Sequence, residues 1–216
     1  MKILFIGNSY TYFHDMPQLL EQLMRDNGID VTVHSVTKGG RKLFENLQQG
    51  DENSEKITEL VDENLYDVLF LQEQSYLPAV NYEVFEDGAR RLKEKVLAKQ
   101  CILYSTWGRK EDCPLLTEKG WTNATMTAAL KEAYDRVGVA IGARVSDVGL
   151  CFARVRQLDS ELELYHPDKS HPSYTGSCVA AVCHYKMITG TLPKNTACLK
   201  TDGIDVILKA AGEIIK

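Results

Sequence analysis

Short apolar runs alternate along this chain with longer stretches in which apolar residues recur every three or four positions. The short runs predict five strands, at residues 2–7, 31–36, 67–71, 101–106 and 139–145. The longer stretches predict helices, at residues 19–24, 85–96, 125–137, 174–185 and 204–211. This order is typical of βαβ units, so the pattern predicts a three-layer α/β/α sandwich around a doubly wound sheet of about five parallel strands.

Two segments between these elements are irregular and polar. The connection over residues 39–64 is long and polar in its middle, which favours two short helices joined by a turn. A second polar passage spans residues 159–172, directly before the late helix. The chain has no linker or repeat, so we expect one domain over residues 1–216. Ligands of doubly wound sheets bind outside the carboxyl ends of the strands, so the residues just after each strand are the best candidates for a site.

Composition and charge exclude several classes of protein. The 216 residues are 44% hydrophobic and 25% charged, as in an ordinary globular domain, which excludes disordered, collagen-like and coiled-coil chains. The 25 Lys and Arg residues are scattered and outnumbered by 30 Asp and Glu, so the net charge of −5 argues against nucleic-acid binding. A domain of this size buries roughly 70% of its unfolded surface, so its core needs no disulfide or metal.

The sequence carries no signal for export or membrane insertion. No stretch approaches the ~18 apolar residues of a membrane helix, and the short apolar run at residues 3–6 does not resemble a signal peptide. The six cysteines show no C-x-x-C spacing, which favours reduced, buried thiols. We therefore expect a cytoplasmic protein without a membrane partner.

The first predicted strand is followed by a serine in the segment GNSYT at residues 7–11. A serine on the turn between a parallel strand and its helix can point its hydroxyl into the crevice, and the helix N-terminus favours a developing negative charge nearby. Ser9 is therefore a candidate nucleophile. Short G-x-S segments are common, however, and the same serine could serve only as a helix cap.

A carboxylate and an imidazole follow near the other end of the chain, in the segment DKSHP at residues 168–172. Asp168 and His171 are three residues apart, which on a loop or a single turn lets the carboxylate orient the imidazole. His171 could then take the proton of Ser9 as a general base. This spacing alone also fits a surface histidine, but together with the serine turn it favours a catalytic triad.

Three segments together resemble the SGNH (GDSL-like) hydrolase superfamily: GNSYT at residues 7–11, GGRKL at residues 39–43 and DKSHP at residues 168–172. They occur in the family's order and at the expected strand ends, so the resemblance covers essentially the whole chain. It implies a flavodoxin-like sandwich and a serine esterase that needs no metal or other cofactor.

The resemblance also implies individual roles. Ser9 would be the nucleophile, His171 the general base and Asp168 its orienting partner. Asn8 stands where GDSL-type sequences have an acidic residue, a change that GNS-type members of the superfamily share.

An oxyanion hole is implied as well, which in this superfamily uses the serine N–H, a glycine N–H and an asparagine side chain. Ser9 and Gly40 match the first two roles. The third block departs from the pattern, because LQEQS at residues 71–75 stands where the family has Gly-x-Asn. Gln74 aligns with the asparagine, whereas Gln72 at the strand end resembles the glutamine of a less characterised SGNH-like subgroup. Either amide could donate to an oxyanion, and we favour Gln72.

Further side chains are candidate substrate contacts. Trp107 and Tyr76 lie on or just after predicted strand ends, where an aromatic ring could stack on a sugar or acyl group, although each ring could equally pack in the core or rim. Arg41 and Arg109 could meet an anionic group of the substrate, with a solvated surface position as the alternative for both.

Other kinds of site fit the sequence less well. The α/β-hydrolase fold has its nucleophile in G-x-S-x-G, and Thr11 replaces the second glycine here. No dinucleotide or P-loop motif follows the first strand. A zinc site from His166, Asp168 and His171 has suitable ligand types but no second cluster to support it. A flavodoxin-like protein could hold a flavin phosphate on the turn at residues 9–11, but it leaves the carboxylate and imidazole without a role.

These residues and the resemblance predict an esterase that hydrolyses a short acyl ester, acetyl above all, on a small molecule or a carbohydrate, through an acyl-enzyme on Ser9. Lysophospholipid and thioester substrates stay open, because the shape of the pocket sets acyl preference. The alternatives from another class are a flavodoxin-like module and a glycan-binding domain of the same fold without hydrolase activity.

Overall fold

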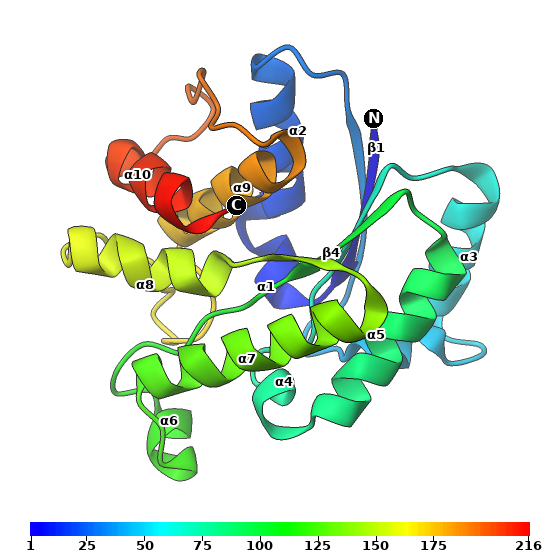
Figure 1. The fold of residues 1–216 in the computed structure, drawn as a ribbon, viewed down its shortest axis with the longest axis horizontal. Coiled ribbons are helices and arrows are strands. Elements are labelled where there is room, and N and C mark those ends of the chain that lie inside the picture. The colour runs from blue at the N-terminus through cyan, green and yellow to red at the C-terminus, as the bar shows by residue number, and fades with distance from the viewer.

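The structure, a computed structural model, describes residues 1–216 and contains one sheet of five parallel strands. The strands stand in the order β2-β1-β3-β4-β5 (Figure 1). Their bounds are β1 Lys2–Gly7, β2 Thr32–Thr37, β3 Val68–Leu71, β4 Gln100–Tyr104 and β5 Arg144–Ser146. Because the order reverses between β1 and β3, their carboxyl ends border the crevice where doubly wound sheets bind ligands.

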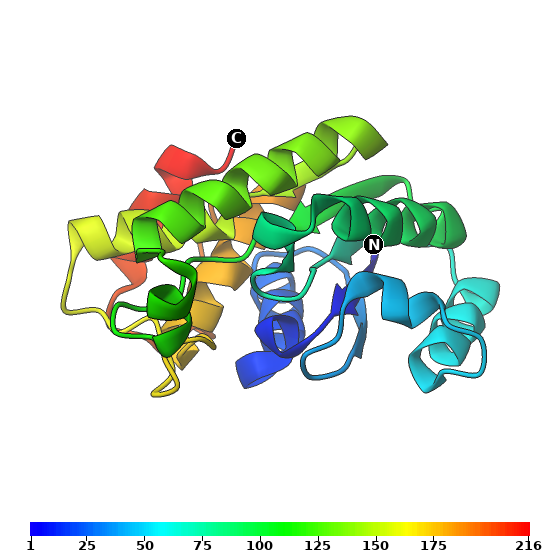
Figure 2. The same ribbon diagram turned by 90° about the horizontal axis from the view of Figure 1, so that it is seen from below.

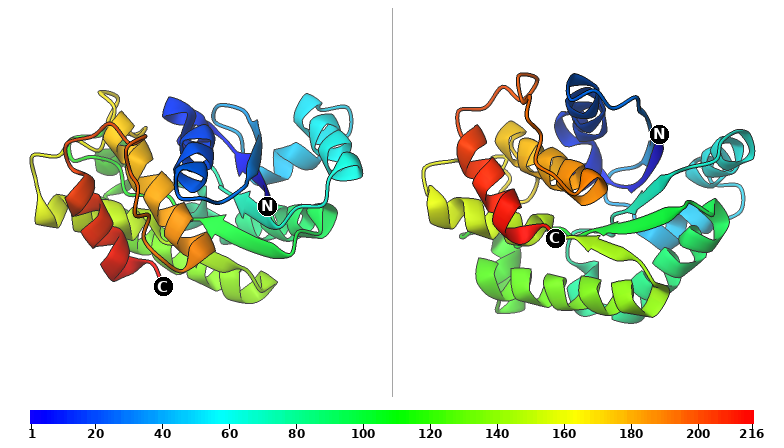
Figure 3. Two further views of the ribbon diagram at one scale, coloured as in Figure 1. Left: turned by 90° about the horizontal axis from the view of Figure 1, so that it is seen from above. Right: turned by 45° about the horizontal axis from the view of Figure 1, so that its top comes forward.

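Helices cover both faces of the sheet, which confirms the predicted three-layer sandwich (Figures 1 and 3). One face is covered by α2 (Met16–Asp26), α8 (Val148–Leu158), α9 (Tyr174–Thr189) and α10 (Ile204–Ile214). The other face is covered by α3 (Glu52–Glu63), α5 (Tyr82–Val96) and α7 (Asn123–Ile141). Shorter helices lie in the connections: α1 (Ser9–Tyr12), η1 (Phe13–Asp15), η2 (Leu43–Leu47), α4 (Leu77–Val80) and α6 (Pro114–Lys119).

Alternate residues of each strand supply two separate cores. Ile3 and Phe5 of β1 pack under α2, α8, α9 and α10, whereas Leu4 and Ile6 pack under α3, α5 and α7. All four side chains are buried, and each contributes about 1.5–3 kcal/mol to stability. Seen from below, α5 and α7 run alongside each other over the second core (Figure 2). Burial on both faces holds β1 firmly in the centre of the sheet, and with it the turn that follows.

The fifth strand is shorter than the sequence predicts. It begins at Arg144 and not at residue 139, because α7 continues to Ile141. Gly142 then ends the helix with a φ of +62°, its N–H capping the carbonyls of Gly138 and Val139. Val139 is 86% exposed, so the apolar run at that point belongs to a helix surface and not to a buried strand.

Other local predictions have mixed outcomes. The connection over residues 39–64 does hold two short helices, η2 and α3, whereas α8 was not predicted. All six cysteines are free, and Cys198 alone among them is not buried. None of the helices has both the length and the apolar character needed to span a bilayer.

Candidate active site

The turn after β1 carries Ser9 at the carboxyl edge of the sheet. Only glycine fits at the end of the strand, because a Cβ on Gly7 would lie 2.5 Å from the hydroxyl oxygen of Thr11. Asn8 caps α1, and its Oδ1 accepts the N–H of Tyr10 at 3.1 Å. Ser9 is the first residue of α1, so its own N–H has no acceptor within the helix.

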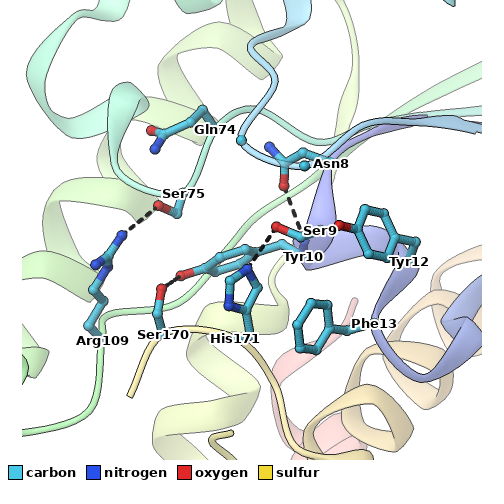
Figure 4. Close-up of a pocket in the computed structure, with 12 residues that line it drawn as sticks. Asn8, Ser9, Tyr10, Tyr12, Phe13, Gln74, Ser75, Arg109, Ser170 and His171 are labelled. Carbon is cyan, nitrogen blue, oxygen red and sulfur yellow. Dashed lines mark hydrogen bonds between the residues drawn. The ribbon is translucent and has the colours of Figure 1, made fainter. Parts of the chain in front are cut away.

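Ser9, His171 and Asp168 form a hydrogen-bonded chain. His171 Nε2 lies 2.8 Å from Ser9 Oγ, as Figure 4 shows, and His171 Nδ1 lies 2.6 Å from Asp168 Oδ2. The fold thus brings the first strand's turn into contact with the loop before α9. In this arrangement the imidazole can take the serine proton while the carboxylate orients it. All three residues predicted from the sequence meet at one place.

The loop around Asp168 fixes the carboxylate. Its Oδ1 accepts the N–H groups of Ser170 and His171, both at 2.9 Å, while Oδ2 faces the imidazole. Lys169 adopts a left-handed conformation, with a φ of +63°, in the turn between them. Burial opposes ionisation, but the hydrogen bonds from His171 and Ser170 outweigh it and hold the pKa of Asp168 well below its usual value. Asp168 is therefore a carboxylate throughout the neutral pH range.

Two aromatic rings hold the imidazole in this position. The ring of Phe13 stacks on His171 with centroids 4.2 Å apart and planes 6° apart, and the ring of Tyr10 lies tilted at 5.3 Å. These contacts restrict rotation of the imidazole away from Ser9 Oγ. Phe13 was not singled out in the sequence, where its place shortly after the serine was the only signal.

Ser9 and His171 open onto a pocket of about 320 Å³. The pocket wall is formed by the turn after β1, residues 39–40, residues 74–75, Arg109 and residues 170–171. Gly40 lies in this wall with a φ of +70°, a conformation that favours glycine, and its N–H has no acceptor in the protein. Two free backbone N–H groups, those of Ser9 and Gly40, therefore border the pocket.

Gln72, which we favoured as the oxyanion donor, is buried outside the pocket. Its Oε1 accepts the N–H of Asn8 at 3.0 Å and the hydroxyl of Thr11 at 2.9 Å, and its NH₂ group donates to the carbonyl of Glu73. The amide oxygen thus joins the turn after β1 to the end of β3, and the NH₂ group bonds within the Gln72 loop. The structure therefore contradicts this preference, since the Gln72 side chain is buried and does not line the pocket.

Gln74, unlike Gln72, is part of the pocket wall. It lines the pocket, and its Oε1 accepts the N–H groups of Tyr76 and Leu77 at 3.3 and 3.2 Å. Its NH₂ group has no acceptor in the protein, so it is free to donate to a group bound in the pocket.

Glu73 places a carboxyl group behind the pocket wall. It is fully buried without an ion pair, and its oxygens accept the N–H of Leu43 at 3.1 and 3.2 Å and the N–H of Gln74 at 2.6 Å. Burial raises the pKa of Glu73 to about 8, against the opposing effect of these two N–H groups. Glu73, which sequence reasoning missed, thus ties the loop after Gly40 to the loop that presents Gln74.

Trp107 is part of the core, so the prediction that it contacts substrate is wrong. The side chain is fully buried and stacks on Tyr10 and Phe152, with ring centroids 4.8 and 4.1 Å apart. Its Nε1 donates to the carbonyl of Ser170 at 3.1 Å. Trp107 therefore supports the loop that carries His171.

Arg41 and Tyr76 also lie outside the pocket wall, contrary to the expectation that they contact substrate. The guanidinium of Arg41 pairs with Asp51 at 2.5 Å and donates to Asn46 at 3.1 Å, so it holds the loop after β2 together. The ring of Tyr76 lies 5.8 Å from the guanidinium carbon of Arg109. Arg109, in contrast, does line the pocket.

The three side chains considered as zinc ligands do not form a metal site. His166 Nδ1 lies 3.1 Å from Asp168 Oδ2, but that oxygen already receives the hydrogen bond with His171. No group of three or more His, Cys, Asp or Glu side chains is arranged to hold a metal ion.

Comparison with known proteins relates the chain to solved structures. No family model matches the sequence, and a search of curated proteins finds no match. A candidate SGNH hydrolase from Slackia heliotrinireducens is 28% identical, with a TM-score of 0.76 over 86% of this chain and 97% of that one. A DUF4886 family protein from Bacteroides uniformis is 17% identical, with a TM-score of 0.81 over 100% of this chain and 94% of that one. An acetyl xylan esterase is 13% identical, with a TM-score of 0.65 over 87% and 100% of the two chains.

The likenesses to the Bacteroides protein and to the esterase concern the fold, whereas the Slackia protein is also similar in sequence. The strand order, the serine turn after β1 and the Asp168–His171 loop agree with the same assignment. By fold, sequence likeness and the position of these residues, the chain is similar to the serine hydrolases of the SGNH hydrolase superfamily.

Proposed function

We propose that the protein is a serine esterase that hydrolyses a short acyl ester through an acyl-enzyme on Ser9. The observation that carries the proposal is the contact of 2.8 Å between Ser9 Oγ and His171 Nε2, in line with the 2.6 Å contact between His171 Nδ1 and Asp168. Both reacting side chains border a pocket that is open to a substrate.

In the first half of the reaction, Ser9 Oγ attacks the ester carbonyl while its proton passes to His171 Nε2. Asp168, whose pKa is held low, stabilises the imidazolium that forms. The tetrahedral intermediate then expels the alcohol, which takes the proton from His171. Water repeats the sequence on the acyl-enzyme, releasing the acid and restoring Ser9.

The negative charge of the tetrahedral intermediate would be held by three donors. These are the free N–H groups of Ser9 and Gly40 and the NH₂ group of Gln74, all of which border the pocket. Donors that are fixed before the reaction stabilise the charge without reorganisation, and each is typically worth on the order of 10²–10³ in rate. Glu73 supports this arrangement, because it anchors both the Gly40 loop and the Gln74 loop.

A short acyl group, acetyl above all, fits this site best. The pocket is small, about 320 Å³, which is at the lower end of the range for ligand sites and leaves little room for a long acyl chain. The likeness of the fold to an acetyl xylan esterase agrees with an acetyl ester on a carbohydrate.

The test is hydrolysis of p-nitrophenyl acetate, butyrate and octanoate by the wild type and by Ser9→Ala. We expect turnover to fall steeply with acyl length in the wild type, and to fall by a factor on the order of 10⁶ in the variant, as for loss of a triad nucleophile. Ser160→Ala, which changes an exposed serine outside the pocket, is the matched control. Equal turnover by Ser9→Ala and the wild type would refute the proposal.

A further inference from the structure

The pocket wall contains an arginine without a counter-ion. Arg109 Nη2 donates to the hydroxyl of Ser75 at 3.2 Å and Nη1 to the thiol of Cys113 at 3.8 Å, while Nε is buried with no acceptor. No carboxylate of the chain pairs with this guanidinium. The other residues of the pocket wall are uncharged, except that His171 is bonded to Asp168. A guanidinium carries five donors, so the second N–H of each terminal nitrogen is left for a bound group.

Arg41 shows what a structural arginine looks like in the same protein. It forms an ion pair with Asp51 and donates to Asn46 and to the carbonyl of Glu45. The guanidinium of Arg109, in contrast, contacts only the Ser75 hydroxyl, the Cys113 thiol and the face of the Tyr76 ring. A partly buried charge is costly unless it is paired, so the unpaired guanidinium of Arg109 points to a partner that the chain itself does not supply.

The backbone around Arg109 is held firmly in place. The N–H of Gly108 donates to the Thr127 hydroxyl at 3.1 Å, and the N–H of Lys110 donates to the carbonyl of Lys169 at 3.0 Å. The second bond ties the arginine segment directly to the loop that carries Asp168 and His171. The position of Arg109 relative to the catalytic loop is therefore set before any substrate binds, which lowers the entropy cost of binding.

Three buried hydroxyl groups lie beside the guanidinium. Tyr10 OH and Ser170 Oγ are 2.7 Å apart, and Ser75 Oγ accepts from Arg109. Figure 4 shows the Tyr10 ring extending from the backbone next to Ser9 toward Ser170, with Arg109 and Ser75 beyond its hydroxyl end. The nucleophile and the guanidinium thus lie at opposite ends of one tyrosine side chain, within a single pocket.

We propose that Arg109, with Tyr10, Ser75 and Ser170, forms a carboxylate-binding subsite, so that the ester substrate carries a carboxylate a short distance from the scissile bond. A guanidinium presents parallel N–H groups that match the two oxygens of a carboxylate, and the hydroxyls supply further donors. The chain as a whole has a net charge of −5, so this positive group is a local feature of the pocket and not part of a basic surface. The inference rests on the esterase function proposed above.

The carboxylate could belong to the alcohol part or to the acyl part of the ester, and two pairs of matched substrates distinguish these sources. O-acetylglycolate and its neutral amide place the carboxylate on the alcohol side. Monoethyl succinate and ethyl succinamate place it on the acyl side. The measurement is kcat/KM for all four esters with the wild type, Arg109→Gln and Arg109→Lys, with thermal unfolding to verify that each variant folds.

We expect the ratio of kcat/KM for the carboxylate over the amide in one pair to fall on the order of 10- to 100-fold in Arg109→Gln, the loss typical of hydrogen bonds to a charged group. Arg109→Lys should recover part of that ratio, since lysine restores the positive charge but not the two parallel N–H groups of the guanidinium. In the wild type the ratio should also fall as salt is raised. The pair that responds identifies the side of the ester that carries the carboxylate.

An Arg109→Gln variant that slows both members of both pairs by the same factor would overturn the subsite and leave the esterase intact. Failure of the wild type to hydrolyse any of these esters or p-nitrophenyl acetate, with no labelling of Ser9 by a fluorophosphonate, would overturn the esterase function and the subsite together.

Discussion

Two loops on opposite sides of the pocket each contribute a carboxyl group, and the two groups behave in opposite ways. Asp168, in the loop before α9, is partly exposed and bonded to His171, and its pKa lies well below the usual value. Glu73, in the loop after β3, is fully buried with only backbone N–H groups as partners, and its pKa is raised to about 8. The pKa of a carboxyl group is thus lowered in one loop and raised in the other, because the two groups differ in burial and in hydrogen-bond partners.

The difference assigns separate tasks to the two loops. Asp168 stays charged, so it can stabilise an imidazolium during each proton transfer. Glu73 faces no reacting atom, and it acts as a positioning residue that joins the loops of Gly40 and Gln74. In the proposed mechanism, one loop therefore supplies the proton chemistry and the other holds the donors for the oxyanion.

The largest effect in this comparison is expected for a change at Asp168, on kcat. Asp168→Asn keeps an oxygen that can accept the N–H groups of Ser170 and His171, but it presents a donor to His171 Nδ1 and favours the wrong tautomer. We expect kcat to fall on the order of 10⁴-fold, as for the equivalent change in other triads. Steady-state hydrolysis of p-nitrophenyl acetate measures this loss.

His166→Ala is the matched control for this loop, because His166 also contacts Asp168 but does not line the pocket. Turnover by the His166→Ala variant should remain within a few-fold of that of the wild type. A drop in Asp168→Asn no larger than that in His166→Ala would mean that the carboxylate does not act through the imidazole.

A smaller effect separates the two glutamines of the Glu73 loop. Gln74→Ala removes a proposed oxyanion donor, so kcat should fall on the order of 10²–10³-fold with little change in KM. Gln72→Ala removes the acceptor of the Asn8 N–H and the Thr11 hydroxyl, so it should destabilise the fold by about 1–3 kcal/mol. Kinetics and urea unfolding of both variants, compared side by side, check this division. The opposite pattern, with catalysis lost and stability kept in Gln72→Ala, would restore Gln72 as the donor.

A further effect concerns the pH dependence of stability and leaves catalysis aside. The pKa of Glu73 is about 8 in the folded chain, so the side chain keeps its proton up to that pH, whereas in the unfolded chain it loses the proton near the ordinary glutamate pKa of 4.5. The folded state binds more protons between these values, so the free energy of unfolding should fall as the pH rises through this window, by about 1.4 kcal/mol per pH unit at most. Glu73→Gln, which cannot ionise, should remove this slope.

Urea unfolding at several pH values from 5 to 8 measures the slope, and Glu59→Gln, at an exposed glutamate, is the control. A wild-type slope that persists unchanged in Glu73→Gln would show that another group produces it.

The sequence predicted the parts of this molecule that depend on local pattern. The central strands are continuous apolar runs, because their side chains are buried on both faces of the sheet. The turn before Ser9 begins at Gly7, where a Cβ would not fit. Residues 139–145 misled the prediction because Val139 lies on an exposed helix face, where burial cannot be judged from residue type.

The remaining parts depend on contacts between distant segments, which the sequence does not display. Gln72 and Gln74 are chemically identical, and only the proximity of Asn8 and Thr11, which bond the Gln72 oxygen, decides that Gln72 is buried while Gln74 lines the pocket. Phe13 and Trp107 are both aromatic residues near strand ends, yet one stacks on His171 and the other is buried beneath the loop. Whether each of these side chains belongs to the core or to the site therefore depends on its neighbours in space and not on its residue type.

The most direct test of the central claim is the reaction of the purified protein with a fluorophosphonate, followed by intact mass and peptide mapping. An activated serine attacks the phosphorus and expels fluoride, whereas an ordinary serine hydroxyl is weak at its free pKa. We expect one phosphonyl group per chain, on Ser9, and none on Ser9→Ala. A well-folded wild type that stays unlabelled, or a variant Ser9→Ala that is labelled equally, would contradict it.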